Sequence, residues 1–368
     1  MSNDNCCDEK ESCCCSANVC CSSNLITPYD ETDKWVTGEI SVPNGSIPCV
    51  ATQRSFKDIF GAWKVRWDIG RANYRINPGL YAVGNPDDTS PVLVSANYKL
   101  TFDMLRKELS EMNLWILILD TKGINVWCAA GKGTFGTDEL VSRVKAVELS
   151  GIVSHRTLIV PQLGAPGMSA HEVKKLTGFS VVYGPVRARD IRAFLDSGMK
   201  ATEDMRTVKF TAWNRLVLTP LEFIRVARIS ITMFGVLFLI NLFAARPFGL
   251  GDFTAYASAV LIGTVITPAL LPAIPGKAFA FKGCVLGLFV TACIVWFNGW
   301  FTSGYWLLAI GYMLALPAHS AFLAMNFTGS STYTSFSGVI KEMKIAVPII
   351  AISLVVGVTM VLIKTFTG

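Results

Sequence analysis

One cysteine stands in a setting where its thiol could bind a metal ion. Cys128 lies in the run Asn-Val-Trp-Cys-Ala-Ala-Gly-Lys, residues 125–132, which follows a strand-like segment. Soft and borderline metal ions favour thiolate ligands. The three small residues that follow, Ala129, Ala130 and Gly131, leave room for a large flat ligand to approach the backbone. This pattern predicts a metal-ligating thiol next to a flat cofactor.

The position of Cys128 within its segment favours a thiolate. The spacing places it at the boundary between a loop and a helix, where a helix N-terminus stabilises negative charge. Lys132 comes four residues later and would share the same helical face. However, a lone cysteine beside Val126 and Trp127 is also typical of a small buried hydrophobic residue. The residues by themselves leave both interpretations open.

The segments around Cys128 alternate short apolar strands with amphipathic helices, which is typical of a parallel, doubly wound α/β sheet. The expected strands are 91–95, 115–120, 157–160 and 181–183. The expected helices are 101–110, 138–150, 169–177 and 187–196. Ligands of such sheets bind beyond the carboxyl ends of the strands. We therefore expect one crevice, lined by the loops 95–98, 121–132, 161–168 and 184–185.

A glycine-rich run in this region has a second interpretation. Residues 131–136 read Gly-Lys-Gly-Thr-Phe-Gly and satisfy the GxGxxG pattern of dinucleotide-binding folds. That fingerprint should follow its strand directly, whereas Gly131 comes well after Asp120. The strand at 157–160 is followed by Pro161 and Gln162, without the acidic residue that would bind a ribose. The context disfavours a dinucleotide site.

The last third of the chain is apolar enough for a membrane. The chain is 51% hydrophobic with a mean hydropathy of +0.44, and the excess lies after about Ile229. Five segments have the length of a bilayer span, roughly 17 to 25 residues, and lack Asp, Glu, Lys and Arg. They are Ile229–Ala245, Phe253–Ile274, Gly283–Trp300, Tyr305–Met325 and Ile345–Ile363. We expect five transmembrane helices, with interfacial aromatic residues such as Trp300 and Trp306 near their ends.

Basic residues beside these segments predict their orientation, because Lys and Arg are retained on the cytoplasmic side. One side carries Arg215, Arg225, Arg228, Lys277, Lys282, Lys341 and Lys344, and the other only Arg246 and Lys364. The chain is therefore expected to be a multi-pass protein of the inner (cytoplasmic) membrane, with its N-terminal domain in the cytoplasm. The net charge of +6 follows largely from this arrangement, so no nucleic-acid partner is expected.

A cluster of cysteines lies at the N-terminus. Its members are Cys6, Cys7, Cys13, Cys14, Cys15, Cys20 and Cys21. The stretch is acidic and lacks the apolar core of a secretory signal, and a cytoplasmic location argues against disulfides. The thiols are either incidental to a disordered tail or capture a soft metal ion, and we favour capture. Cys284 and Cys293 lie within a span and are expected to be packing residues.

Several segments resemble one known family. The motif around Cys128 is similar to the signature of the corrinoid proteins of microbial mercury methylation, the HgcA family. Other similar segments are 95–101 (SANYKLT), 119–123 (LDTKG), 133–139 (GTFGTDE), 162–167 (QLGAPG) and 181–188 (VVYGPVRA). The same blocks are more distantly similar to the corrinoid-binding domain of the corrinoid iron–sulfur protein of the acetyl-CoA pathway. The resemblance runs from about Ile47 to the C-terminus and leaves out the first 24 residues.

The resemblance implies a fold and a set of site residues. It implies a Rossmann-like corrinoid-binding domain at 47–200, after a Cys-rich tail and linker at 1–46. A juxtamembrane linker at 201–228 and a membrane domain at 229–368 follow. The cofactor would be cobalamin or a related cobamide, with Cys128 as the lower axial ligand of cobalt. The residues implied to line it are Ser95, Ala96, Asn97, Asn125, Val126, Trp127, Cys128, Ala129, Ala130, Gly131, Lys132, Gly133, Thr134, Phe135, Gly164, Ala165, Pro166, Gly167, Tyr183, Gly184 and Pro185.

The resemblance also implies an activity, corrinoid-dependent methyl transfer to Hg(II) that produces methylmercury. A thiolate opposite the methyl group favours transfer of a carbanion-like methyl, which suits a soft electrophile such as Hg(II). The tail cysteines would then be candidate Hg(II) ligands. The chain lacks an obvious ferredoxin cysteine pattern. The implied partners are therefore a ferredoxin-like [4Fe–4S] electron donor of HgcB type and a methyltetrahydrofolate-linked methyl donor.

Two alternative functions stay open at this point. The chain could be a membrane-anchored methyl carrier for another acceptor, or a membrane protein that takes up mercury or senses a ligand. Transporters usually place polar or ionisable groups at membrane depth. His319, two residues after Pro317, is the only Asp, Glu, Lys, Arg or His side chain in the five expected spans. We expect His319 to pack beside a kink or a helix end, and the bundle to serve as an anchor.

Overall fold

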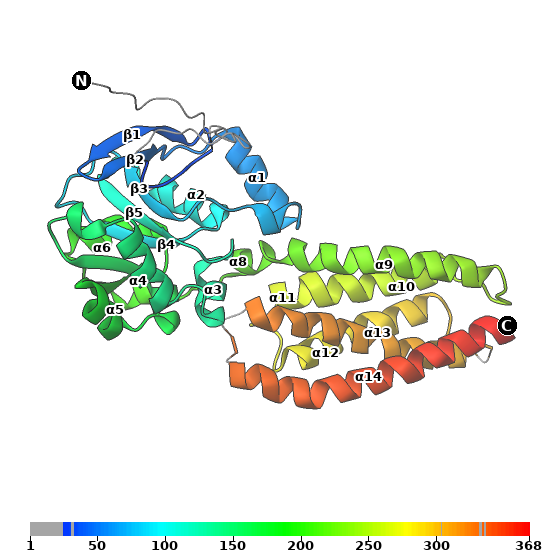
Figure 1. The fold of residues 1–368 in the computed structure, drawn as a ribbon. Helices are drawn as coiled ribbons and strands as arrows, with labels where there is room; N and C mark the ends of the chain where they lie inside the picture. The colour runs from blue at the N-terminus through cyan, green and yellow to red at the C-terminus, as the bar shows by residue number, and fades with distance from the viewer. Residues whose placement is uncertain (1–24, 31–32, 303, 331–332, 335) are drawn as a thin grey trace, which may run out of the picture. The chain divides into compact units, whose positions relative to one another are not determined.

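The computed structural model describes residues 25–30, 33–302, 304–330, 333–334 and 336–368. The contacts divide the chain into two compact units, and Figure 1 labels most of their helices and strands. The sheet unit contains the described residues up to Ala62 together with Ala72–Thr207. The helical unit contains Trp63–Arg71 and Val208–Gly368.

One seven-stranded sheet forms the centre of the sheet unit. Its strands are β1 (Val36–Val42), β2 (Gly45–Val50), β3 (Gly79–Val83), β4 (Val92–Ala96), β5 (Leu114–Leu119), β6 (Thr157–Pro161) and β7 (Ser180–Gly184). Their order across the sheet is β1-β2-β3-β5-β4-β6-β7. β5, β4, β6 and β7 run parallel, which confirms the expectation for these four strands.

The remaining strands correct the expectation of a fully parallel sheet. β1 is antiparallel to β2, and β3 is antiparallel to β5, so the sheet is mixed. β1 and the first residues of β2 also precede Ile47, where the family resemblance placed the start of this domain. The sheet therefore contains part of the segment that we expected to be a tail and linker.

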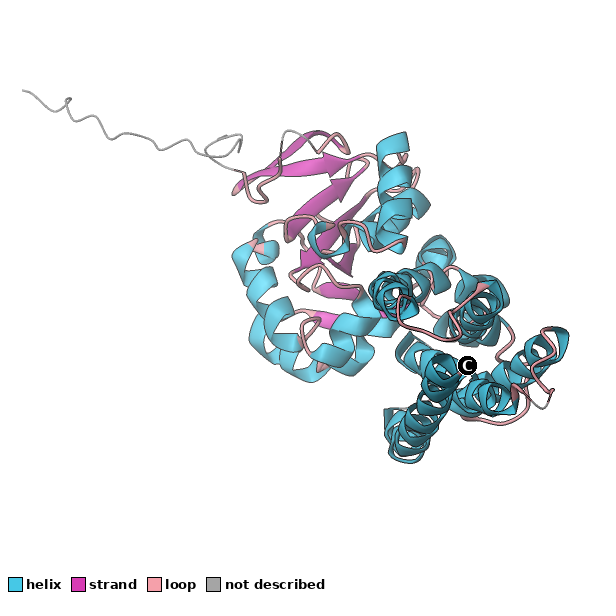
Figure 2. Ribbon diagram, turned by 90° about the vertical axis from the view of Figure 1, so that its right-hand side faces the viewer, coloured by secondary structure: helices cyan, strands magenta, loops and turns pink. Residues whose placement is uncertain are grey.

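Helices cover both faces of the sheet, as Figure 2 shows. The helical elements of this unit are α2 (Lys99–Glu108), α3 (Val126–Lys132), α4 (Thr137–Ala146), η2 (Leu149–Gly151), η3 (Gln162–Gly167), α5 (Ala170–Thr177), η4 (Ala188–Asp190), α6 (Ile191–Asp196) and α7 (Glu203–Arg206). α3, α4 and α5 pack in one apolar core, whereas α2 and α6 pack in another. Because both faces are covered, β4 and β5 are apolar along most of their length and are buried throughout.

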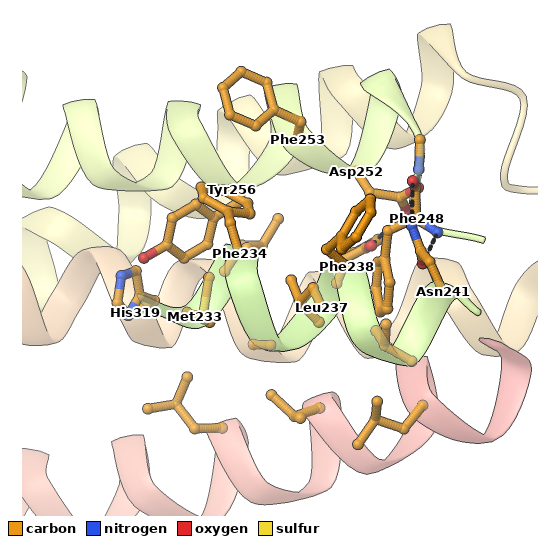
Figure 3. Close-up of a pocket in the computed structure, with 18 residues that line it drawn as sticks. Met233, Phe234, Leu237, Phe238, Asn241, Phe248, Asp252, Phe253, Tyr256 and His319 are labelled. Atoms are coloured by element: carbon orange, nitrogen blue, oxygen red, sulfur yellow. Dashed lines mark hydrogen bonds between the residues drawn. The ribbon is translucent and has the colours of Figure 1, made fainter. Parts of the chain in front are cut away.

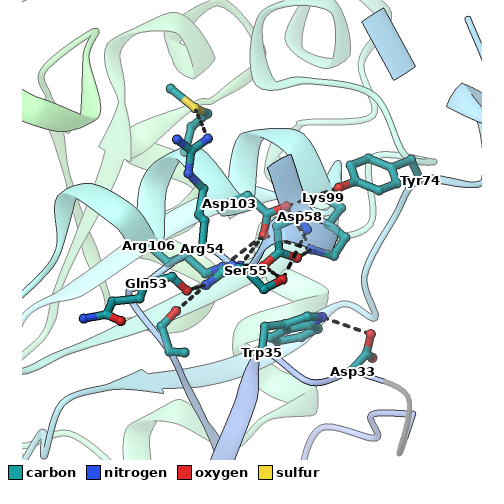
Figure 4. Close-up of polar contacts among 12 residues, drawn as sticks. Asp33, Trp35, Gln53, Arg54, Ser55, Asp58, Tyr74, Lys99, Asp103 and Arg106 are labelled. Carbon is teal, nitrogen blue, oxygen red and sulfur yellow. Dashed lines mark hydrogen bonds and ion pairs between the residues drawn. The ribbon is translucent and has the colours of Figure 1, made fainter. Parts of the chain in front are cut away.

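A buried polar network joins α2 to the part of α1 (Phe56–Arg66) that belongs to the sheet unit, residues up to Ala62, as Figure 4 shows. The Arg106 guanidinium donates from Nη2 to Asp58 Oδ2 at 2.8 Å and from Nε to Asp103 Oδ1 at 2.9 Å. Lys99 Nζ donates to both carboxylates at 2.8 Å. Burial alone would raise the pKa of Asp58, but hydrogen bonds from Lys99 and Ser55 hold it well below the usual range. Each buried charge therefore has partners of opposite sign.

Removing one member of this network is expected to be costly. Arg106→Met should lower the free energy of unfolding of the sheet unit by about 3 to 5 kcal/mol, because two buried carboxylates lose their main partner. Pulse proteolysis in urea measures this change. Lys107→Ala is a matched control, since Lys107 pairs with Glu108 at the surface and such pairs contribute about 0 to 1 kcal/mol. Equal losses in the two variants would contradict the role of the network.

The described residues of the helical unit contain five helical segments that are long and apolar enough to cross a membrane, the number that the sequence predicts. They run over Ala212–Asn241, Leu250–Ala269, Phe279–Phe297, Trp306–Asn326 and Ser337–Thr367. The elements of this unit are η1 (Arg71–Asn73, which begins here), α8 (Ala212–Leu216), α9 (Thr219–Asn241), α10 (Leu250–Leu261), the π-helix η5 (Ile262–Ile266), α11 (Thr267–Ala269), α12 (Phe279–Phe297), α13 (Trp306–Asn326), η6 (Phe327–Ser330) and α14 (Phe336–Thr367).

Small residues let these helices approach closely. A Cβ on Gly311 of α13 would lie 2.9 Å from the carbonyl oxygen of Gly357 on α14, and a Cβ on Gly357 would lie 2.6 Å from that of Gly311. On α12, Gly283 and Gly287 face Ser320 of α13 in the same way. Close backbone contact through glycine is typical of helix pairs in membranes, where van der Waals packing replaces the hydrophobic effect.

Residues expected on one side of a membrane lie at one end of the helical unit. The Arg246 backbone N–H donates to Thr365 O at 2.9 Å, and Lys364 Nζ lies 5.1 Å from the ring centre of Tyr305. At the other end, Arg215 Nη2 donates to Ala269 O at 2.8 Å, and Lys282 donates to Leu271 O. The helix order in the structure thus agrees with the expected alternation of sides.

Candidate functional site

The carboxyl ends of the four parallel strands meet at one edge of the sheet. β4 pairs with β5 along its whole length, but with β6 only at Val92–Leu158 and Leu93–Ile159, near the amino ends of both strands. The helix that follows β4, α2, covers one face, and the helix that follows β6, α5, covers the other. Chain reversal of this kind marks the place where ligands bind to open α/β sheets. The loops after β4, β5 and β6 surround this place.

Cys128 lies on the short helix α3, which follows β5. Asn125 caps this helix, because its side-chain oxygen accepts a hydrogen bond from the Cys128 N–H at 2.9 Å. Val126, Ala129 and Ala130 of α3 face the apolar core. The Cys128 side chain is exposed, as are Trp127 and Lys132. The predicted boundary between loop and helix is confirmed, and the alternative of a buried hydrophobic cysteine is wrong.

Asn97 organises the loop that leads to α3. Its side chain is only 2% exposed, and its Oδ1 accepts hydrogen bonds from Thr121 N, Thr121 Oγ1 and Gly123 N at 2.9 to 3.1 Å. Its Nδ2 donates to Asp120 Oδ1 at 3.1 Å. The Asp120 N–H in turn donates to Glu139 on α4 at 2.8 Å. Asn97 therefore holds the loop between β5 and α3 in place.

The site residues Asp120, Thr121 and Glu139 are absent from the set of cofactor residues that the sequence predicts. A signal for them was present, because all three lie in segments that carry the family resemblance. Burial alone would raise the pKa of Asp120, but hydrogen bonds from Lys122 lower it below the usual value. Asp120 is thus held as a carboxylate at the edge of the site.

Asn97→Leu is expected to loosen this loop. The Gly123 N–H loses its acceptor, which costs about 1 to 3 kcal/mol, whereas Thr121 N and Thr121 Oγ1 keep Leu119 O and Ile124 O as acceptors. Hydrogen exchange read by mass spectrometry should show faster exchange in residues 120–135. Asn113→Leu is the matched control, since Asn113 Oδ1 accepts from Asn85 N in another loop. Unchanged exchange in residues 120–135 of the Asn97 variant would contradict the proposed role.

The loop after β6 packs directly on α3. A Cβ on Gly167 would lie 2.2 Å from Phe135 O and 3.2 Å from the Ala130 Cα, and a Cβ on Gly164 would lie 2.3 Å from the Phe135 ring. Both glycines are therefore required for close packing of η3 against α3 and Phe135. The Tyr183 hydroxyl at the end of β7 donates to Met168 O at 3.2 Å, which holds the same loop from the other side.

The predicted cofactor residues thus divide by exposure. Those with exposed side chains or backbone are Trp127, Cys128, Gly131, Lys132, Gly133 and Pro166. Those that are partly exposed are Asn125, Thr134, Ala165, Gly167 and Tyr183. Those that are buried are Ser95, Ala96, Asn97, Val126, Ala129, Ala130, Phe135, Gly164, Gly184 and Pro185. A ligand can touch the first group directly, whereas the last group shapes the support beneath it.

Metal binding at this site would depend on a single protein thiol. Among the residues that the structure describes, no group of three His, Cys, Asp or Glu side chains is placed to hold a metal ion. The tail cysteines lie outside the described residues. The GxGxxG run begins with the last two residues of α3 and ends directly before α4, whereas a dinucleotide site requires it between a strand and a helix.

A cavity of about 460 Å³ lies within the helical unit, as Figure 3 shows. α9, α10, α13 and α14 line it with mainly apolar side chains. His319 borders one end, where its ring stacks on Tyr256 with centres 5.4 Å apart. The Nε2 atom of His319 is buried and forms no hydrogen bond with any residue that the structure describes. His319 lies inside α13 rather than at its end, two residues after Pro317.

The fold defines a class of domain, an α/β domain in which the loops after β4, β5 and β6 meet at the carboxyl edge of the sheet. Residues 69–195 match the profile of the family described as CO dehydrogenase/acetyl-CoA synthase delta subunit. The match covers β3 to α6 and leaves out α1 and the five long helices.

Individual proteins are similar over the same region. The gamma subunit of the acetyl-CoA decarbonylase/synthase complex of Methanopyrus kandleri is 30% identical over 128 residues, 34% of this chain and 27% of that protein. The corrinoid/iron–sulfur protein large subunit of Moorella thermoacetica is 30% identical over 122 residues, 33% of this chain and 26% of that protein. The gamma 2 subunit of the acetyl-CoA decarbonylase/synthase complex of Methanosarcina thermophila is 35% identical over 123 residues, 32% of this chain and 25% of that protein. The chain spans about a quarter of the length of these relatives. Residues 69–195 therefore form a domain like that of the corrinoid/iron–sulfur large subunits.

Proposed function

We propose that the sheet unit binds a corrinoid and serves in methyl transfer to Hg(II), with Cys128 as the residue that would bind its cobalt. The observation that carries the proposal is the exposed thiol of Cys128, on a helix whose other face is fixed in the core. The similarity to the corrinoid/iron–sulfur protein large subunit of Moorella thermoacetica supports the corrinoid, and the resemblance of residues 125–132 to the mercury-methylation family supports the acceptor.

The residues present fit a corrinoid. A side chain at Gly131 would meet no protein atom within 4 Å, so the surface beside Cys128 is low and open to a flat ring system. The donor is a thiol, which binds soft and borderline metal ions as a thiolate. When bound, the corrinoid supplies the cobalt centre that carries and releases the methyl group.

The other residues of the site would position this thiol. Asn125 fixes the first turn of α3 by capping the Cys128 N–H. Ala129 and Ala130 anchor the helix in the core, and Gly167 lets η3 support it from below. Lys132 lies one helical turn after Cys128 and places a positive charge beside the site. These contacts keep the thiol in one place relative to the sheet edge.

The proposal includes partners and a location. The described residues hold no group of cysteines for an iron–sulfur cluster, so electrons would come from a ferredoxin-like [4Fe–4S] protein. A methyltetrahydrofolate-linked enzyme would supply the methyl group. The five long helices would hold the protein in the cytoplasmic membrane, with the sheet unit in the cytoplasm.

An absorption spectrum of the purified full-length protein tests the cofactor, and a methylation assay tests the acceptor. We expect corrinoid bands after reconstitution with cobalamin, and methylmercury when Hg(II), a low-potential reductant and a methyl donor are added. A colourless protein that cannot be reconstituted would refute the whole proposal. Corrinoid bands without methylmercury would instead favour a methyl carrier for another acceptor.

A further inference from the structure

The outer face of α1 is strongly apolar. Phe56 is 81% exposed, and Ile59, Phe60 and Trp63 are each about half exposed. These positions follow the spacing of one helical face. The opposite face of the helix is buried and contains Asp58, whose ion pairs with Lys99 and Arg106 fix the orientation of α1. Because the ion pairs hold Asp58 on the buried face of α1, the apolar side chains of the opposite face remain on the surface of the protein.

This apolar face is rich in aromatic rings and continues beyond the helix. The rings of Phe56 and Phe60 stack with centres 6.3 Å apart, and those of Trp63 and Trp67 lie 5.9 Å apart. Ile69, in the loop after the helix, is 46% exposed. Tryptophan and other aromatic residues favour the boundary between lipid headgroups and acyl chains. The composition therefore suits a membrane surface.

The loop after α1 is bound to the start of the first long apolar helix. Asp68 Oδ2 lies 3.1 Å from Arg228 Nη1 and 4.0 Å from Arg225 Nε on α9. The next residue of α9, Ile229, is 72% exposed and begins its uncharged part. If the uncharged part of α9 lies in the acyl region, Asp68 lies at headgroup level. Trp67 and Ile69 flank Asp68 and share that level.

Basic residues beside this face complement anionic headgroups. Lys57 and Lys64 lie within α1, and Arg66 forms its last residue. A helix with an aromatic apolar face and flanking cations is typical of segments that lie in the plane of a membrane surface. Basic residues near such a surface are attracted to anionic lipid.

We propose that α1 and the loop to Ile69 form an in-plane membrane segment, with the apolar face of α1 at the headgroup boundary of the bilayer that holds the five long helices. The segment lies almost entirely before the residues that match the CO dehydrogenase/acetyl-CoA synthase family, so the inference is independent of the proposed methyl transfer. It attaches the N-terminal part of the chain to the membrane well before the first span.

Fluorine NMR on the full-length protein tests this placement. The protein is labelled with 5-fluorotryptophan and placed in nanodiscs of neutral and anionic phospholipid in a 3:1 ratio. Its nine tryptophans are assigned by Trp→Phe variants. Dissolved oxygen relaxes signals in lipid, and a gadolinium chelate relaxes signals in water. Trp296, 73% exposed on α12, serves as the lipid reference, and Trp127, exposed on α3, serves as the water reference.

We expect Trp63 and Trp67 to follow Trp296, with oxygen relaxation several times stronger than for Trp127. A Trp63 signal that responds to the gadolinium chelate like Trp127 would overturn the proposal. A Trp63 signal shielded from both agents would also overturn it, because the face would then be covered by protein.

Charge substitution gives a second test that keeps the fold. Ile59→Asp should raise the gadolinium relaxation of Trp63 several-fold, because a carboxylate on the apolar face opposes insertion among anionic lipids. Leu176→Asp on α5 is the matched control, since Leu176 and Ile59 are both 50% exposed. Unchanged relaxation of Trp63 in the Ile59 variant would count against the membrane segment.

Discussion

Cys128→Ala is expected to abolish methyl transfer to Hg(II). The loss should exceed about 100-fold, because even the outer partners of a metal ligand contribute about 10- to 100-fold in affinity or activity. The corrinoid spectrum should change to that of a form without thiolate ligation. Folding should be unaffected, since Cys128 is exposed and substitutions at such surface positions usually change stability by less than about 0.5 kcal/mol.

Two other cysteines provide matched controls for this result. Cys49 lies on β2 and Cys293 on α12, and both are partly buried. Cys49→Ala and Cys293→Ala should keep the wild-type spectrum and activity. If Cys128→Ala also kept both, the axial-ligand assignment would be wrong. If Cys293→Ala lowered methylation in intact cells but not in lysate, the helical unit would have a role in mercury uptake.

Gly131→Leu is expected to block corrinoid binding while the protein remains folded. A Cβ on Gly131 would have no protein atom within 4 Å, so the leucine would project into the space proposed for the ring system. The affinity for corrinoid should fall at least about 10-fold, which corresponds to a loss of roughly 1.4 kcal/mol of binding free energy. Cobalt content and circular dichroism of the same sample measure the two effects.

The neighbouring residue gives the contrasting result. Ala130 is buried beside Gly167, so Ala130→Leu should destabilise the sheet unit by about 1 to 3 kcal/mol through overpacking. Its loss of corrinoid would then follow from displacement of α3 and η3. Normal corrinoid content in Gly131→Leu would place the ring system elsewhere on the domain.

The strands and helices around Cys128 could be predicted because their apolar patterns are continuous. β5 is buried at every position, and its expected range differs from the observed one by one residue at each end. β1 and β2 could not be predicted in the same way. β1 is exposed or partly exposed throughout, so its sequence carries little hydrophobic periodicity. Its place depends on pairing with β2 rather than on its own pattern.

The site shows a similar division. The helix start beside Cys128 was predictable because Asn125, directly before Val126, is a strong N-cap residue. Which of the small residues face the core could not be predicted, because spacing alone does not say which face of a seven-residue helix meets the core. Ala129 and Ala130 face inward, whereas Gly131 faces outward. The apolar face of α1 also depends on tertiary contacts, since buried Asp58 sets its orientation.

The ion pair between Asp68 and Arg228 closes a loop of 160 residues. During synthesis, Trp63 and Ile69 therefore leave the ribosome long before α9 exists, and the whole sheet of β3 to β7 is made in the interval. Contacts of such sequence separation form late, because the entropy of closing the loop must be overcome first. Until then, this apolar segment would need a chaperone or the membrane surface itself to prevent aggregation.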